Sequence, residues 1–174
     1  MQGLIHLYTG EGKGKTTAAI GLAVRAAGSG KRVLFGQFMK GNDTSELCIL
    51  SQIEGIEIRR LKKNFGFVSC MDEAEKEEIT VAHTQMLKDM AELAKQGLID
   101  VLIMDELTYV YTYELIDMDI LTDFLKNKPE ELELVITGRN PVPMLYELAD
   151  YITDMQCVRH PYEEGIAARK GIEF

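Results

Sequence analysis

The chain has 174 residues, of which 46% are hydrophobic, and a formal net charge of −9. Its length suits one domain over residues 1–174, and no apolar run approaches the roughly 20 residues of a membrane span. Its negative charge argues against broad nucleic-acid binding, which depends on basic side chains that neutralise phosphates. No basic leader or cleavage site precedes the first expected strand, so we expect a cytoplasmic protein without membrane association.

The cysteines Cys48, Cys70 and Cys157 are odd in number and lack C-x-x-C spacing. This pattern favours reduced thiols with a packing role over a disulfide framework or a zinc site.

The charges are unevenly distributed. Residues 1–40 contain six basic side chains and one acid, a net charge of +5, and the remainder of the chain carries −14. Such a concentration of positive charge suits a small polyanion.

The stretch TGEGKGKTT, residues 9–17, departs from the phosphate-binding pattern G-x-x-x-x-G-K-[ST] because Thr9 stands where the first glycine is usual. Gly10, Gly12 and Gly14 let backbone N–H groups turn toward an anion at a helix N-terminus. An apolar strand at 4–8 and a helix at 16–27, with apolar positions 20, 23, 24 and 27, provide the required context. We therefore favour a polyphosphate site over a flexible turn.

Within this loop, the ammonium group of Lys15 is expected to contact phosphate oxygens, and the hydroxyl of Thr16 to ligate Mg²⁺. Lys13 and Thr17 are secondary candidates. The side chain of Lys13 is also consistent with simple solvation.

The middle of the chain alternates strands and helices. We predict strands at 32–38 and 56–61 around a short helix at 46–53, and then a loop at 62–71. Asp72 caps a long helix that ends near residue 96, before Gly97. Its apolar residues recur at helical spacing and should face the core: Ile79, Ala82, Met86, Met90, Leu93 and Ala94.

The run IDVLIMDE, residues 99–106, is typical of a central parallel strand that is buried on both faces and opens on a site at its carboxyl end. Asp105 and Glu106 fall at that end, where a carboxylate can ligate Mg²⁺ beside the phosphate loop. The alternative is that the two acids simply cap a helix that follows the strand. Because the chain also contains GKGKTT, we favour the Mg²⁺ site over this alternative.

The last third predicts a helix at 118–126, a strand at 132–139, a short helix from the prolines at 141 and 143 to residue 148, and a strand at 151–158. Together the elements predict an α/β fold with a parallel sheet and helices on both faces. Arg139 ends its strand, where it can reach phosphate or pair with a surface acid.

These features predict an ATP- or GTP-binding domain with Mg²⁺, but they leave the reaction open. Phosphoryl transfer by a kinase or ATPase is the usual activity of such a site, and Glu106 would then position water. A nucleotide-sensing module without catalysis is a further alternative.

The segments TGEGKGKTTAAIG, QFMKG, NFGFVS, IMDELTYVYTYELI, VITGRN, ELAD and VRHPYEEGIAARKGIEF resemble the ATP:corrinoid adenosyltransferase family in order and over essentially the whole chain. The resemblance implies a RecA-like P-loop domain, usually homodimeric. Such a domain transfers the 5′-deoxyadenosyl group of ATP to the reduced cobalt of a corrinoid, cobalamin or a precursor, and releases triphosphate. The resemblance is also compatible with an electron-donor protein, such as a flavodoxin, as a partner.

The resemblance implies roles for individual residues. Asp105 and Glu106 would hold Mg²⁺ with Thr16, and Lys15, Glu106 and Arg139 would act in catalysis. Arg25 would reach the nucleotide or a neighbouring subunit. Because the family binds ATP in the reverse direction, a shifted loop is reasonable. The implied contacts of the triphosphate are Thr9, Gly10, Glu11, Gly12, Lys13, Gly14, Lys15, Thr16 and Thr17.

In the loop NFGFVS, Phe67 matches an aromatic residue with which the family displaces the lower axial ligand of cobalt, and we count it as catalytic. Ser69 stands where the best-known branch has tryptophan, and the chain has no Trp. Phe65 could substitute, or both phenylalanines could simply pack beneath the loop. Tyr109, Tyr111 and Tyr113 are expected to line a corrinoid-facing surface or a subunit contact. We expect His160 to make a structural hydrogen bond rather than to bind metal.

Overall fold

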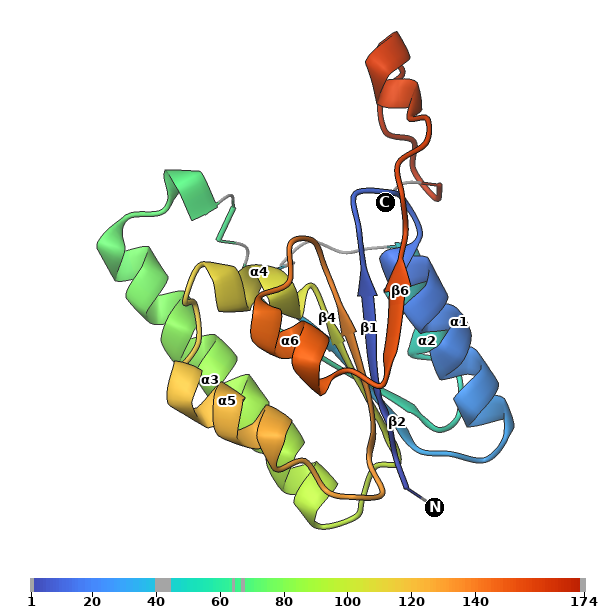
Figure 1. Ribbon diagram of the computed structural model, residues 1–174, viewed down its shortest axis with the longest axis vertical. Coiled ribbons are helices and arrows are strands. Elements are labelled where there is room, and N and C mark those ends of the chain that lie inside the picture. Colours follow the sequence, from blue (N-terminus) through green and yellow to red (C-terminus); the bar gives the residue numbers. More distant parts are fainter. Residues whose placement is uncertain (1, 40–44, 64, 67, 173–174) are drawn as a thin grey trace.

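A computed structural model describes residues 2–39, 45–63, 65–66 and 68–172 (Figure 1). Its centre is a six-stranded sheet in which every paired strand is parallel, in the order β3-β2-β4-β5-β1-β6. All strands therefore point their carboxyl ends to one edge. The strands are β1 (Ile5–Thr9), β2 (Val33–Gln37), β3 (Ile56–Arg60), β4 (Val101–Asp105), β5 (Glu133–Thr137) and β6 (Tyr151–Asp154).

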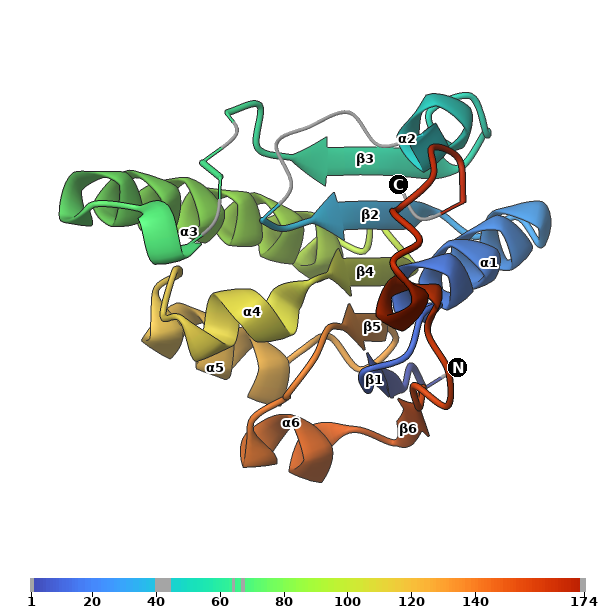
Figure 2. The same ribbon diagram turned by 90° about the horizontal axis from the view of Figure 1, so that it is seen from above.

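Helices cover both faces of the sheet (Figures 1 and 2). One face carries α1 (Lys15–Gly28) and α2 (Ser45–Leu50). The other carries α3 (Glu73–Lys95), α4 (Leu107–Thr112), α5 (Met118–Lys126) and α6 (Pro143–Leu148). Short 3₁₀ helices occur at Val68–Cys70 and Pro161–Glu164. The α/β sandwich predicted from the sequence is confirmed and is consistent with a RecA-like P-loop domain.

The strands β2 and β4 are buried at every position, because helices cover both of their faces. The prediction of α3 also holds at its start. The carboxylate of Asp72 accepts from the backbone N–H of Glu75, and the Glu75 side chain accepts in return from the N–H of Asp72. This capping box, followed by Gly97 at φ 65°, sets the length of the helix.

The buried face of α1 differs from the prediction. Its buried residues are Lys15, Ala19, Ala23 and Ala26. Of the four positions expected in the core, Ala23 is buried, Ile20 and Ala27 are partly buried, and Val24 is 43% exposed. Small alanine side chains let the helix lie close to the sheet, and Lys15 must face the loop that precedes it. Packing distance, rather than hydrophobicity, therefore selected this face.

Helix α4 was not predicted. Its sequence, LTYVYT, is rich in β-branched and aromatic residues, which have low helix propensity. The helix forms because Leu107 and Val110 are fully buried in the core shared with α3 and α5. Tertiary burial has overridden local preference here.

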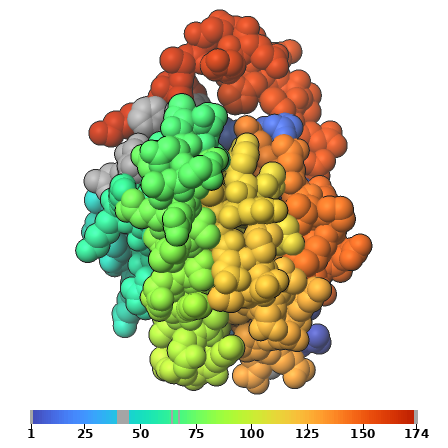
Figure 3. Space-filling view, turned by 90° about the vertical axis from the view of Figure 1, so that its left-hand side faces the viewer, coloured from blue at the N-terminus to red at the C-terminus, as the bar shows by residue number. Residues whose placement is uncertain are grey.

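The last strand is shorter than predicted and ends at Asp154. Its neighbour β1 ends at Thr9, whose pairing with Asp154 is the last in the register, so no strand remains to pair with residues 155–158. The chain continues as a tail, residues 155–172, which projects beyond the body of the molecule (Figures 1 and 3).

All three cysteines are free, as expected, but all three are exposed, so the predicted packing role is wrong. Each lies outside the two apolar cores, which are built from side chains facing the sheet. Among the described residues, no helix is long and apolar enough to cross a membrane.

His83 lies on the buried face of α3 and is completely inaccessible. Its Nδ1–H donates to the carbonyl of Leu115 at 2.9 Å, and its Nε2 accepts from the backbone N–H of Met39 at 3.5 Å. The ring also packs against Phe38, with 5.3 Å between centroids. Burial lowers the pKa of His83 to about 4, so the ring is neutral at physiological pH.

Acidification should destabilise the fold through His83. In the unfolded chain this ring is protonated near the ordinary histidine pKa of 6.5, whereas its folded pKa is about 4. The stability that the neutral, buried His83 ring contributes to the fold is therefore fully present above about pH 6.5 and is lost as the pH falls toward 4. Between about pH 7.5 and 5, the free energy of unfolding should drop by roughly 2 kcal/mol on this account, as measured by urea titration. His83→Gln should lack this component, and an identical pH dependence in both proteins would refute the assignment.

Candidate active site

The glycine-rich loop between β1 and α1 starts one residue later than the usual pattern. Gly10 and Gly14 have φ values of 99° and 119°, which L-residues rarely adopt. Thr9 still belongs to β1, is 3% exposed, and pairs with Asp154 of β6. A glycine at position 9 is unnecessary because the chain does not leave the strand until Gly10.

The end of β6 and the first residue of the tail press against this loop and explain two of its glycines. A Cβ atom on Gly10 would lie 2.2 Å from Oδ1 of Asp154, and one on Gly12 would lie 2.6 Å from the carbonyl oxygen of Met155. The N–H of Gly12 donates to that same carbonyl at 2.6 Å. The outer side of the loop is thus fixed by the chain that follows β6.

Lys15 opens α1, is 9% exposed, and points back into the loop. Its Nζ donates to the carbonyls of Gly10 at 2.6 Å and Gly12 at 2.8 Å. Burial lowers the pKa of Lys15, and the nearby positive charge of Arg139 lowers it further. In the part of the chain that the structure describes, no side chain caps the N-terminus of α1, so its partial positive charge adds to that of Lys15. These features together suit a polyphosphate.

Asp105 joins three elements at the carboxyl edge of the sheet. Its Oδ1 accepts from the hydroxyl of Thr16 at 2.8 Å and from the hydroxyl of Thr137 at 2.7 Å. Asp105 is completely buried at the end of β4, Thr16 lies in the first turn of α1, and Thr137 ends β5. The predicted approach of Asp105 to the phosphate loop is therefore present, although β5 lies between β1 and β4.

Glu106 follows with φ 62°, in the left-handed region, and its N–H donates to the Thr137 hydroxyl at 3.0 Å. This sharp turn ends β4 and begins α4, which places the Glu106 carboxyl group at the same edge as Asp105. Left-handed non-glycine residues are uncommon and concentrate at functional sites.

Arg139 reaches the loop from the end of β5. Its Nη2 donates to the carbonyl of Glu11 at 3.4 Å, and its Nε lies 3.4 Å from Oε2 of the same residue. Both of the roles left open by the sequence are thus compatible with its position. Its side chain is 45% exposed, so the ion pair with Glu11 contributes little to stability and could yield to another anion.

The remaining predicted phosphate contacts are divided between two hollows. Lys13 and Gly12 line a hollow of about 570 Å³ under the tail. Thr16 and Thr17 line another, with Ser45 of α2. Arg25 is separate, because it lies in the last turn of α1, about 15 Å along the helix axis from Lys15.

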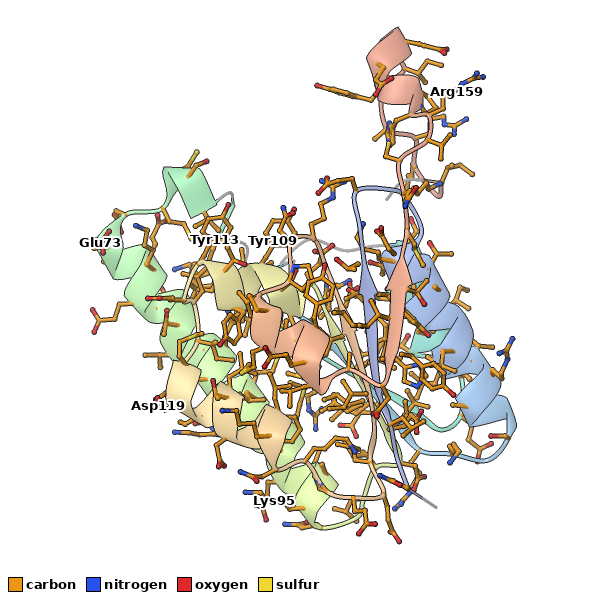
Figure 4. The ribbon with its side chains drawn as sticks, viewed as in Figure 1. Glu73, Lys95, Tyr109, Tyr113, Asp119 and Arg159 are labelled. Atoms are coloured by element: carbon orange, nitrogen blue, oxygen red, sulfur yellow. The ribbon has the colours of Figure 1, made fainter. Side chains whose placement is uncertain are left out.

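Two of the three tyrosines expected near a corrinoid, Tyr109 and Tyr113, line an apolar hollow of about 360 Å³. Tyr109 of α4 stacks on Tyr113, the residue that follows this helix, with 6.3 Å between ring centroids and 12° between planes. Figure 4 shows both at the upper edge of α4. The hollow shares Glu106 with the polar edge described above. Its lining residues are Met39, Gly66, Val68, Ser69, Glu106, Tyr109 and Tyr113.

The loop NFGFVS is described only in part, and Phe67 lies outside the described residues. Phe65 packs against the main core, and the ammonium of Lys63 lies 4.7 Å from its ring centroid. Tyr111 is half-buried and packs on that core rather than lining the hollow. Nδ1 of His160 accepts from the N–H of Tyr162 at 3.2 Å, which is the structural hydrogen bond expected.

Comparison with known proteins agrees with the resemblance. Residues 1–174 match the family described as ATP:corrinoid adenosyltransferase BtuR/CobO/CobP. The chain belongs to this family. It is 32% identical to the corrinoid adenosyltransferase of Escherichia coli K12 and 32% identical to CobA of Salmonella typhimurium LT2, in both cases over 99% of this chain and 86% of the relative. It is 34% identical to a corrinoid adenosyltransferase of a Sinorhizobium species, over 99% of this chain and 81% of the relative.

Sequence reasoning missed Thr137 and Met39. Thr137 organises Asp105 and Glu106, and its signal was available: a hydroxyl residue closes the apolar strand LELVIT directly before Gly138. Met39, with φ 62°, lines the apolar hollow and donates its N–H to His83. Nothing local distinguishes it, because its position depends on α3.

Gly138 is required by the close approach of α4. Its φ is 142°, and an added Cβ would lie 2.0 Å from Oγ1 of the buried Thr108. Gly138→Ala should therefore destabilise the fold by at least about 2 kcal/mol, through backbone strain and overpacking, as measured by urea unfolding. Gly21→Ala in α1 is the control. Outside the adjacent turns of α1, no atom of the described residues lies within 4 Å of its added Cβ, so the variant should be neutral or slightly stabilised. Equal effects at both glycines would contradict this account.

Proposed function

We propose that this chain transfers the 5′-deoxyadenosyl group of ATP to the Co(I) centre of a reduced corrinoid, either cobalamin or a precursor, and releases triphosphate. The observation that carries the proposal is that the apolar hollow and the polar edge of the sheet meet at Glu106. A large apolar substrate and a polyanion can therefore bind next to each other. Family membership supports this pairing of ATP with a corrinoid.

In the proposed reaction, an electron pair of Co(I) forms the bond to C5′, and the pair of the C5′–O bond departs with the triphosphate. Co(I) is itself the nucleophile, so the protein supplies alignment and positive charge. Residues 9–17 cradle the triphosphate. Lys15 and Arg139, which both contact backbone carbonyls of this loop, neutralise the charge that develops on the leaving group.

The residues at this edge fit Mg²⁺. The hydroxyl of Thr16 and the carboxylates of Asp105 and Glu106 are oxygen donors of the type that Mg²⁺ prefers. Across the described residues, no group of three or more His, Cys, Asp or Glu side chains forms a metal cage. That composition suits an ion held by few protein ligands together with substrate phosphates. When bound, the ion would screen the negative charge of the triphosphate.

The apolar hollow between α4 and the 3₁₀ helix Val68–Cys70 is the proposed corrinoid surface. The stacked rings of Tyr109 and Tyr113 offer an apolar face, and Glu106 closes the side nearest the phosphate loop. Phe67, from the loop that borders this hollow, would displace the lower axial ligand. Ser69 lines the hollow, which leaves more room than a tryptophan would.

The family resemblance leads us to propose also a cytoplasmic homodimer that receives its corrinoid reduced by an electron-donor protein such as a flavodoxin. The strand β6 supports an association with a second copy. It forms an edge of the sheet, and its Tyr151 and Ile152 are 53% and 48% exposed.

Product analysis tests the transfer reaction. Incubation with MgATP and chemically reduced corrinoid should produce the absorption spectrum of a cobalt–carbon bond and one intact triphosphate per adenosyl group. Production of ADP and phosphate without the spectral change would favour a kinase or ATPase. MgATP binding without turnover would favour a nucleotide-sensing module.

The loop cation gives a quantitative prediction. Lys15→Ala should lower the rate of adenosyl transfer by roughly 10²–10³, the usual effect of losing one preorganised charge-stabilising group. Lys31→Ala, which removes an exposed lysine from the connection between α1 and β2, is the matched control and should keep the wild-type rate. A near-normal rate for Lys15→Ala would disprove the proposed phosphate site.

A further inference from the structure

Gln37, the last residue of β2, is a buried side chain that the proposed mechanism does not use. It is completely inaccessible, yet neither Oε1 nor Nε2 has a hydrogen-bond partner among the described residues. A buried amide without partners destabilises a fold, whereas an apolar side chain of similar size would not. Buried polar groups without hydrogen-bond partners are rare in native structures. Such a group therefore indicates that the amide forms its hydrogen bonds with a water or a ligand rather than with the chain.

The sheet register places Gln37 beside Asp105. The two residues are paired across β2 and β4, so their backbones lie about 4.8 Å apart. In β2, Val33 and Phe35 lie four and two residues before Gln37, and both pack in the core under α1. In β4, Ile103 lies two residues before Asp105 and packs in the same core. Alternation therefore directs the side chains of Gln37 and Asp105 to the same face of the sheet, at its carboxyl edge.

That face is the one on which α1 begins. The hydroxyl of Thr16 reaches down from the first turn of α1 to Oδ1 of Asp105 at 2.8 Å. The Gln37 amide thus lies in the layer immediately beneath the proposed triphosphate site, next to the acid that organises it. On its other side, β3 contributes Arg60 in the paired position.

We propose that Gln37 is a positioning residue for nucleotide binding, and that its amide holds an ordered water that MgATP brings in beside Asp105. This inference rests on the proposed function. The amide offers an acceptor and two donors, so it can orient a water between Asp105 and the phosphate end of the nucleotide. A carboxylate in the same place would add a second negative charge beside Asp105.

The amide therefore makes the nucleotide-free fold less stable than it could be and improves the binding of ATP. This predicts opposite effects of one substitution. Gln37→Met, which is similar in size but apolar, should raise the melting temperature without nucleotide and weaken MgATP binding by roughly 5- to 10-fold. The KM for ATP should rise by a similar factor, with the KM for the corrinoid unchanged.

The experiment compares wild type, Gln37→Met and Gln85→Met by thermal unfolding and by titration calorimetry with MgATP. Gln85 is exposed on α3, so its variant should change neither quantity. If Gln37→Met lowers the melting temperature and leaves MgATP affinity unaltered, Gln37 is purely structural and the inference is wrong. No change in either quantity, or no MgATP binding by wild type, also overturns it. Calorimetry needs no corrinoid, so failure of adenosyl transfer alone would refute the proposed function and leave this inference standing.

Discussion

The two hydrogen bonds accepted by Oδ1 of Asp105 are the constraint on which the site depends. They tie the first turn of α1, through Thr16, to the ends of β4 and β5, through Asp105 itself and Thr137. Because Asp105 is completely buried, the carboxylate has no access to solvent and its orientation is set by these donors. The position of α1, and with it the phosphate loop, is thereby fixed relative to the two strand ends that carry Glu106 and Arg139.

A second constraint acts on the opposite side of the loop. The chain leaving β6 passes so close to Gly10 and Gly12 that neither position tolerates a Cβ atom. The loop is held between this chain and α1, and Lys15 closes it by bonding two of its carbonyls. A loop of this rigidity loses little entropy when a polyphosphate binds, which is how a preorganised site gains affinity.

At the carboxyl edge of the sheet, one face is polar and the other is apolar. On the α1 face, the row formed by Gln37, Asp105 and Thr137 is polar and buried. On the other face, α4 presents stacked tyrosine rings to an apolar hollow. Glu106 lies at the boundary, since its left-handed turn carries the chain from one face to the other. A reaction between a polyanionic nucleotide and a large macrocycle needs both environments within a short distance.

The amino-acid sequence by itself determined the α/β class, most strand and helix positions, the glycine-rich loop between β1 and α1, and the place of Asp105 and Glu106 at the carboxyl end of a buried strand. These features follow from local signals: hydrophobic periodicity, glycine spacing and caps act over a few residues. Tertiary structure alone decided the buried face of α1, the existence of α4 and the end of β6, because each depends on which neighbour is available for packing or pairing. It also placed Thr137 and Gln37 beside Asp105. Those contacts join residues far apart in the chain, and their distances are set by strand order, which no local pattern encodes.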